Sequence, residues 1–136
     1  MTAKLMLRIA SFISLLFALG HSLGGLNKWS PTGDNPVLKA MTDVPFTIMG
    51  VRRTYLDLYL GLGWTLSVFM LLQTILLWQM ASLAEADAAR VRPMIAAFAL
   101  ATLAGGVLAS VLIFPVPALF SAALLIALVL AWFARR

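Results

Sequence analysis

Three long stretches of this chain carry no Asp, Glu, Lys or Arg: Ile9 to Asn27, Leu58 to Ala84, and Pro93 to Ala134. A helix needs about 20 apolar residues to cross a bilayer. The third stretch is long enough for two crossings, and its segment "FPVP" at 114–117 marks the turn between them, because proline ends helices. The sequence therefore predicts an all-α integral membrane protein, a bundle of four transmembrane helices.

We expect a single membrane domain over residues 1–136 whose helices cover about 5–25, 47–81, 93–113 and 118–134. An outer loop at 26–46 joins the first two helices, and we expect a short helix over Val37–Met41 within it. The basic and then apolar N-terminal segment has the composition of a signal peptide. We expect it to be retained as the first span.

Composition narrows the function classes. Of 136 residues, 62% are hydrophobic and 11% are charged, whereas a soluble domain is about a quarter charged. The absence of cysteine excludes thiolate catalysis and Cys-ligated metal. One histidine without ligand spacing predicts no metal site, and we expect no cofactor. The net charge of +5 comes from residues at the span ends, so we expect no nucleic-acid partner.

The basic residues also predict an orientation. Four spans place both termini and the 84–92 loop on one side, and positive charge favours the cytoplasm. That side holds six basic residues: Lys4, Arg8, Arg90, Arg92, Arg135 and Arg136. The other side holds four: Lys28, Lys39, Arg52 and Arg53. We therefore expect cytoplasmic termini, with His21 and the 26–46 loop on the outer face.

Stripes of small residues predict the packing faces, because membrane helices associate where backbones approach closely. The stripes are Ser11, Ser14 and Ala18 in the first helix, Ala97, Ala101, Gly105 and Ala109 in the third, and Ala123, Ala127 and Ala131 in the fourth. Such stripes do not distinguish contacts within one chain from contacts between subunits, so a homo-oligomer stays possible.

The segment "GVRRTYLDLYLGLGW" at 50–64 gathers the polar residues of the second helix. An aspartate two turns into a span is costly in hydrocarbon and normally has a partner. We expect Arg53 to pair with Asp57, with His21 as a second candidate partner. His21, Asp57, Arg53 and Tyr55 are then candidate acid–base residues, and the candidate ligand-binding residues are Trp29, Arg52, Tyr59 and Trp64. The alternative is that the arginines and aromatic residues only anchor the span at the interface, and that His21 only ends its helix.

The motif Gly20-His21-Ser22 and the run Arg53-Thr54-Tyr55-x-Asp57-x-Tyr59 resemble those of small bacterial four-helix membrane proteins that are described only as conserved hypothetical proteins. The resemblance covers about the first 80 residues and implies no activity. The architecture is similar to that of small membrane isomerases of the emopamil-binding type and of trimeric glutathione-pathway enzymes, although their acidic and asparagine motifs are absent.

Two functions follow from these residues. The first is a pocket between the first two helices that binds a lipid or lipophilic small molecule, with or without acid–base chemistry at His21 and Asp57. The second is a non-catalytic bundle or interaction partner in which the same polar residues are structural. A cavity that reaches His21 and Asp57 favours the first, and side chains that close on one another favour the second.

Overall fold

The computed structural model describes residues 2–134. It has five helices and one hairpin: α1 (Ala3–Gly25), α2 (Pro36–Asp43), β1 (Pro45–Ile48), β2 (Val51–Thr54), α3 (Tyr55–Ala86), α4 (Ala88–Leu112) and α5 (Pro115–Phe133). Four of them, α1, α3, α4 and α5, are long and apolar enough to span a membrane. The fold class predicted from the charge-free stretches is confirmed, and the chain is a multi-pass membrane protein.

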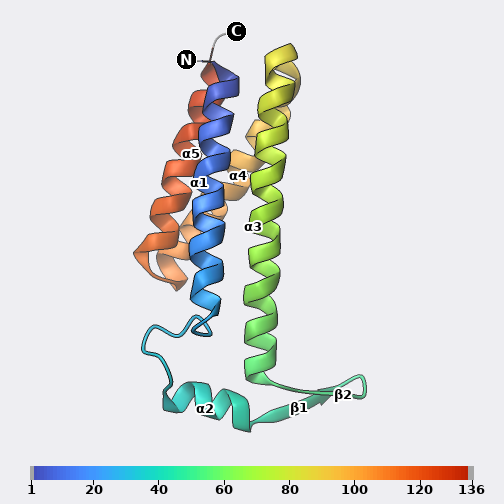
Figure 1. The fold of residues 1–136 in the computed structure, drawn as a ribbon, viewed down its shortest axis with the longest axis vertical. Helices are drawn as coiled ribbons and strands as arrows, with labels where there is room; N and C mark the ends of the chain where they lie inside the picture. The colour runs from blue at the N-terminus through green and yellow to red at the C-terminus, as the bar shows by residue number, and fades with distance from the viewer. Residues whose placement is uncertain (1, 135–136) are drawn as a thin grey trace. The chain divides into compact units, whose positions relative to one another are not determined.

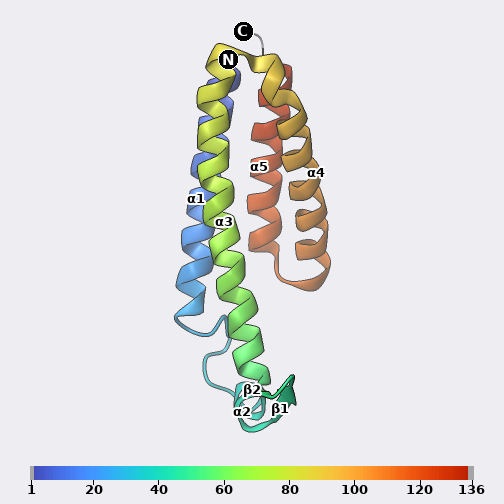
Figure 2. The same ribbon diagram turned by 90° about the vertical axis from the view of Figure 1, so that its right-hand side faces the viewer.

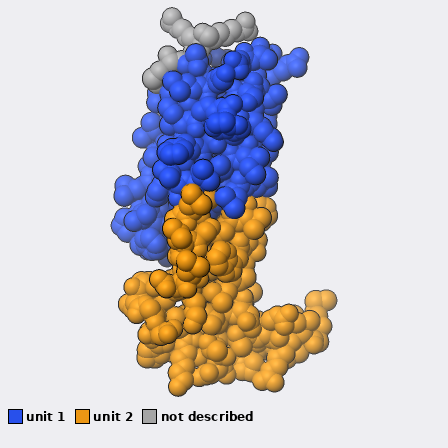
Figure 3. Space-filling model, in the orientation of Figure 1, with its two compact units in different colours: residues 1–17, 70–136 blue, residues 18–69 orange. Residues whose placement is uncertain are grey.

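The chain divides into two compact units, residues 1–17 with 70–136 and residues 18–69 (Figure 3). The basic residues Arg135 and Arg136, which contribute to the expected orientation, lie outside the described residues. Each unit contains part of α1 and part of α3, and each has its own packing.

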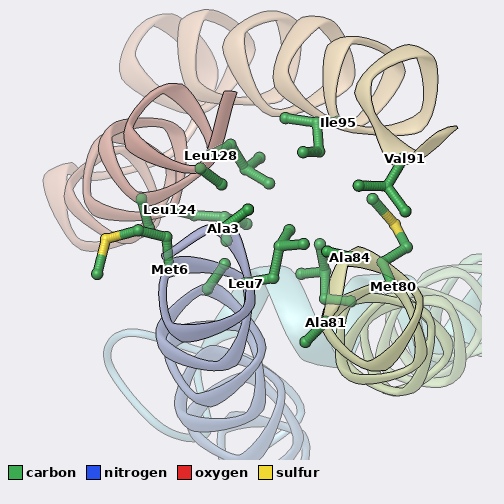
Figure 4. Packing of buried hydrophobic residues seen from close by; sticks show 14 residues of the cluster. Ala3, Met6, Leu7, Met80, Ala81, Ala84, Val91, Ile95, Leu124 and Leu128 are labelled. Atoms are coloured by element: carbon green, nitrogen blue, oxygen red, sulfur yellow. The ribbon is translucent and has the colours of Figure 1, made fainter. Parts of the chain in front are cut away.

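The first unit has an apolar core to which α1, α3, α4 and α5 all contribute (Figure 4). Leu7, Leu77 and Leu128 are fully buried, and Met80 and Ile95 are almost so. Polar contacts flank this core: the Ser11 hydroxyl donates to the Thr74 carbonyl over 2.8 Å, and the Thr74 hydroxyl donates to Ser14 over 3.0 Å. The predicted packing stripe of α1 is therefore confirmed.

The helices α4 and α5 run side by side as a helical hairpin (Figure 2). Of the predicted α4 stripe, only Ala109 is buried within the chain, whereas Ala97, Ala101 and Gly105 are exposed. The face that packs on α5 is that of Thr102, Gly106 and Ala109: an added Cβ at Gly106 would lie 3.0 Å from that of Ser121. In α5, Ala127 and Ala131 are buried as predicted, whereas Ala123 is exposed.

The second unit departs from the prediction at the start of α3. Residues 47–54, expected as helix, belong instead to the β1–β2 hairpin, in which Phe46 pairs with Arg53 and Ile48 with Val51. The turn residues Met49 and Gly50 both have positive φ, 52° and 79°, as a two-residue type I′ turn requires. The predicted short helix is confirmed as α2, whose N-cap Asn35 accepts from the backbone N–H of Val37 and Leu38.

Candidate functional site

The centre of the second unit is the side chain of Trp29, just beyond α1. Lys28 and Trp29 have positive φ, 55° and 49°, and these two residues turn the chain back on the helix. The Trp29 backbone N–H donates to the Gly24 carbonyl over 2.9 Å. Its indole N–H donates to the His21 carbonyl over 2.8 Å. The ring is therefore fixed against the last turn of α1 by two hydrogen bonds.

Three glycines make room for this ring. A Cβ added at Gly24 would lie 3.0 Å from the Trp29 indole, and one at Gly25 would lie 2.8 Å from both Trp29 and Trp64. On α3, a Cβ at Gly63 would collide with the Trp29 ring. Since real Cβ atoms do not approach other atoms so closely, the ring is seated where α1 and α3 both lack side chains. We call Gly24, Gly25 and Gly63 the glycine seat.

His21 joins α1 to α3 at the same place. Its imidazole Nε2 lies 3.1 Å from the Gly63 carbonyl oxygen, and its ring centroid lies 5.2 Å from that of Trp29. Because a carbonyl only accepts hydrogen bonds, the Nε2 atom that faces it must carry the proton. His21 therefore holds two helices together through one ring nitrogen and shields one face of the tryptophan.

Two further aromatic residues of α3 complete the packing around Trp29. Trp64 meets it edge to face at a centroid distance of 5.2 Å, and Tyr59 meets it edge to face at 6.3 Å. The Tyr59 hydroxyl donates to the Trp29 carbonyl over 3.4 Å. Of the residues predicted to bind a ligand, Trp29, Tyr59 and Trp64 thus lie together. With His21 they form what we call the Trp29 cluster.

Asp57 lies outside the Trp29 cluster and has a different role. It is in the first turn of α3 rather than two turns down, because the helix begins at Tyr55. Its Oδ2 accepts from the Thr54 backbone N–H over 2.8 Å and from the Thr54 hydroxyl over 3.0 Å, and its own N–H donates to that hydroxyl oxygen over 3.1 Å. These reciprocal bonds form a capping box, which satisfies N–H groups that a helix start leaves free.

The remaining predicted site residues lie on the hairpin or at its end. The Arg53 guanidinium donates to the Arg52 carbonyl over 2.8 Å, and the ion pairs among residues 2–134 do not include the expected Arg53–Asp57 pair. Tyr55 packs its ring on Phe46 with a centroid distance of 5.2 Å. His21 contacts Gly63 rather than Asp57. The four candidate acid–base residues therefore do not lie together at one site.

An open groove of about 600 Å³ lies beside the Trp29 cluster. It is lined by residues of the 28–36 loop, including Trp29, by α2 and by Tyr59 of α3. Its lining is mostly apolar, with contributions from Pro31, Pro36, Val37, Leu38 and Met41. Lys28 stands at the same groove and reaches Asp34 at 3.5 Å. The space predicted between α1 and α3 is thus filled by Trp29, and the concavity lies on the loop side of that ring.

Sequence reasoning did not predict that Trp29 occupies the glycine seat or that Thr54 caps α3 together with Asp57. The pattern Thr-x-x-Asp at 54–57 is a helix-start signal that would have found the second. No local sequence pattern predicts the glycine seat, because Gly63 contacts Trp29 only after folding.

Within residues 2–134 no group of three His, Cys, Asp or Glu side chains is arranged to hold a metal ion. Comparisons with protein-family models, curated proteins and solved structures give no match for this chain.

Proposed function

We propose that this protein binds an amphipathic, lipophilic molecule in the groove beside Trp29, without transforming it. The observation that carries the proposal is the groove itself: about 600 Å³ of mostly apolar space against an indole that hydrogen bonds and the glycine seat hold in place. Small-molecule sites are concave, mostly apolar and largely pre-formed. A rigid aromatic wall lowers the ordering cost of binding.

The lining suggests the chemistry of the ligand. Met41 and Val37 of α2 face apolar parts of a ligand, and methionine adapts its shape readily. The Lys28 ammonium keeps N–H donors beyond its 3.5 Å contact with Asp34, and the Tyr59 hydroxyl, which donates to Trp29, can still accept, so both can bond a polar end of the ligand. An apolar body with one polar or acidic group fits this distribution, as in an isoprenoid or fatty molecule.

Binding without catalysis is favoured because the candidate acid–base groups already have structural partners. The His21 Nε2 is engaged with the Gly63 carbonyl, and the Asp57 carboxylate is engaged with Thr54. A general acid or base must reach the proton it transfers, and neither group lines the groove. This supports the reading of the polar residues as structural elements beside a binding site.

The proposed location is a bacterial inner membrane with cytoplasmic termini. The excess of basic residues on the side of the termini supports it, as does the resemblance of Gly20–Ser22 and Arg53–Tyr59 to small bacterial membrane proteins. Near the N-terminus, Lys4 pairs with Glu85 at 2.7 Å, and the Arg8 guanidinium lies 3.2 Å from the centre of a Trp78 ring. Basic and tryptophan side chains are typical of the membrane–water interface.

Mass spectrometry of the purified protein with its native lipid extract tests the binding proposal. Met41→Trp should fill the groove and lower the co-purified amphiphile, whereas Leu23→Trp, on an exposed part of α1, should leave it unchanged. Both variants should melt close to the wild-type protein. Equal retention of every lipid species by the two variants, both folded, would count against the groove as the binding site.

A further inference from the structure

The β1–β2 hairpin has an apolar, exposed tip. Met49 is 98% exposed, Ile48 62% and Val51 47%. Met49 also has a φ of 52°, a turn position where Asn, Asp or Gly is the usual residue. A methionine there gains nothing from local backbone preference or from packing within the chain. The tip therefore suits contact with something apolar outside the second unit.

The pairing register sorts the hairpin side chains onto two faces. Phe46, Ile48, Val51 and Arg53 share one face, and Thr47 and Arg52 share the other. Phe46 continues the apolar face back to Tyr55 through their ring contact of 5.2 Å. The hairpin thus has an apolar tip with one arginine behind it on each face.

The length of α3 is compatible with a place for the hairpin at a membrane surface. The hairpin joins directly to α3, whose 32 residues span ~48 Å at ~1.5 Å per residue, more than a hydrocarbon core of about 30 Å. Asp57 marks the last charge before the apolar run of that helix. Figure 1 shows the hairpin running sideways from the first turn of α3. A strand pair that leaves the head of a span sideways lies along the headgroup region.

The charged residues of the second unit indicate which kind of lipid surface the hairpin contacts. The second unit has four basic residues, Lys28, Lys39, Arg52 and Arg53, against three acids, Asp34, Asp43 and Asp57. Lys28 contacts Asp34, and Asp57 is bonded to Thr54. The two arginines are therefore the strongest positive feature beside the tip. A guanidinium has five N–H donors in a fork that fits phosphate, so Arg53 keeps donors beyond the one bonded to Arg52.

A second strand is a poorer partner for this hairpin than a lipid. On β2, the Arg52 carbonyl already accepts from Arg53, and the Thr54 N–H already donates to Asp57. On β1, Pro45 has no N–H to donate. These are features by which edge strands avoid adding another strand. The side chains, rather than the strand edges, remain available.

We propose that residues 45–54 form a membrane-surface anchor that inserts Ile48, Met49 and Val51 among acyl chains and binds lipid phosphates through Arg52 and Arg53, with a preference for anionic phospholipid. This anchor is separate from the groove beside Trp29 and does not depend on what the groove binds. It fixes the head of α3 at the bilayer surface, where an isolated two-stranded hairpin would otherwise be only marginally stable.

Because the natural chain has no cysteine, one introduced thiol gives a clean probe. Met49→Cys carries a polarity-sensitive fluorophore in the full-length protein, reconstituted in nanodiscs of phosphatidylcholine with phosphatidylglycerol. We expect blue-shifted emission that lipid-borne quenchers reduce. Lys39→Cys on an exposed position of α2 is the matched control and should give a water-like spectrum. The same water-like spectrum at position 49 would overturn the insertion.

The arginines are tested by the lipids retained in the same nanodiscs. Each of Arg52→Gln and Arg53→Gln should lower the ratio of bound phosphatidylglycerol to phosphatidylcholine by about fivefold. Arg52→Gln alone is the safer variant, because only its backbone carbonyl takes part in the hydrogen bonds described above. An unchanged ratio in a folded variant would overturn phosphate binding. Disulfide cross-linking of Met49→Cys between two chains, together with a water-like spectrum at position 49, would overturn the lipid partner, since a second copy would then cover the tip.

Discussion

The indole N–H of Trp29 donates a 2.8 Å hydrogen bond to the backbone carbonyl of His21. The backbone of the chain's single histidine is therefore hydrogen-bonded to Trp29, the residue that fills the space between α1 and α3. The His21 imidazole makes a second hydrogen bond, to the Gly63 carbonyl. His21 thus links the residues of the Trp29 cluster, and this arrangement leads to two measurable consequences.

The glycine seat predicts different effects for two glycines of α3 that lie two residues apart. Gly63→Ala adds a methyl group that clashes with the Trp29 ring, and overpacking of this kind costs about 1–3 kcal/mol. Gly61→Ala meets no atom within 4 Å and should not lower the Tm. The check is thermal unfolding of both variants in the same detergent. Equal Tm values for the two would mean that Trp29 is not seated on Gly63.

The role of His21 predicts rescue by a neutral side chain. His21→Ala removes the bond to Gly63 and should lower the stability by about 1 kcal/mol. His21→Gln has an N–H donor and should restore part of that loss, although it cannot act as a base near neutral pH. The measurement is the Tm of the variants together with their retained amphiphile. If the glutamine variant keeps its fold but loses the ligand, His21 has a direct binding role.

The capping box predicts which partner Asp57 depends on. A double-mutant cycle of Thr54→Ala with Asp57→Ala should show clear coupling in unfolding free energy, because each change removes the same bonds. A cycle of Arg53→Gln with Asp57→Ala should show little coupling. Thr54→Ala alone should cost about 1 kcal/mol, as the loss of an N-cap does. Stronger coupling of Asp57 to Arg53 than to Thr54 would support the ion pair expected from sequence and contradict the capping box.

The packing of α4 on α5 predicts opposite outcomes at two adjacent glycines. Gly106→Leu directs bulk at Ser121, 3.0 Å from the first added carbon, and should strongly reduce detergent stability. Gly105→Leu points to open space and should be tolerated. Unfolding in detergent compares the two. A large loss at Gly105 instead would show that this face is covered by another helix, as in an oligomer.

Sequence alone was sufficient for the four spans, because the cost of charge in hydrocarbon leaves long charge-free stretches. The predicted start of the second span is wrong, because Ile48, Val51 and Thr54 belong to the hairpin and α3 begins at Tyr55. Their β-branched side chains, the Gly50 turn and the Thr54–Asp57 cap all indicate a hairpin followed by a helix start. The depth assigned to Asp57 was wrong for the same reason.

Other features had no decisive local signal. Small residues occur on more than one face of α4, so sequence did not distinguish the Gly105 face from the Gly106 face. Of the four predicted ligand-binding residues, Trp29, Tyr59 and Trp64 lie together, whereas Arg52 lies on β2. What the sequence did not reveal is that Trp29 itself fills the predicted space, because that depends on three glycines from two helices.

The most direct test of the account is a high-resolution cryo-electron microscopy map of the protein in native-lipid nanodiscs. The account predicts elongated density in the groove, against Trp29 and Met41, with the Trp29 ring seated on Gly63 and His21 facing the Gly63 carbonyl. Density that displaces Trp29 and extends between α1 and α3 to both His21 and Asp57 would contradict it, because those two residues would then line the binding site.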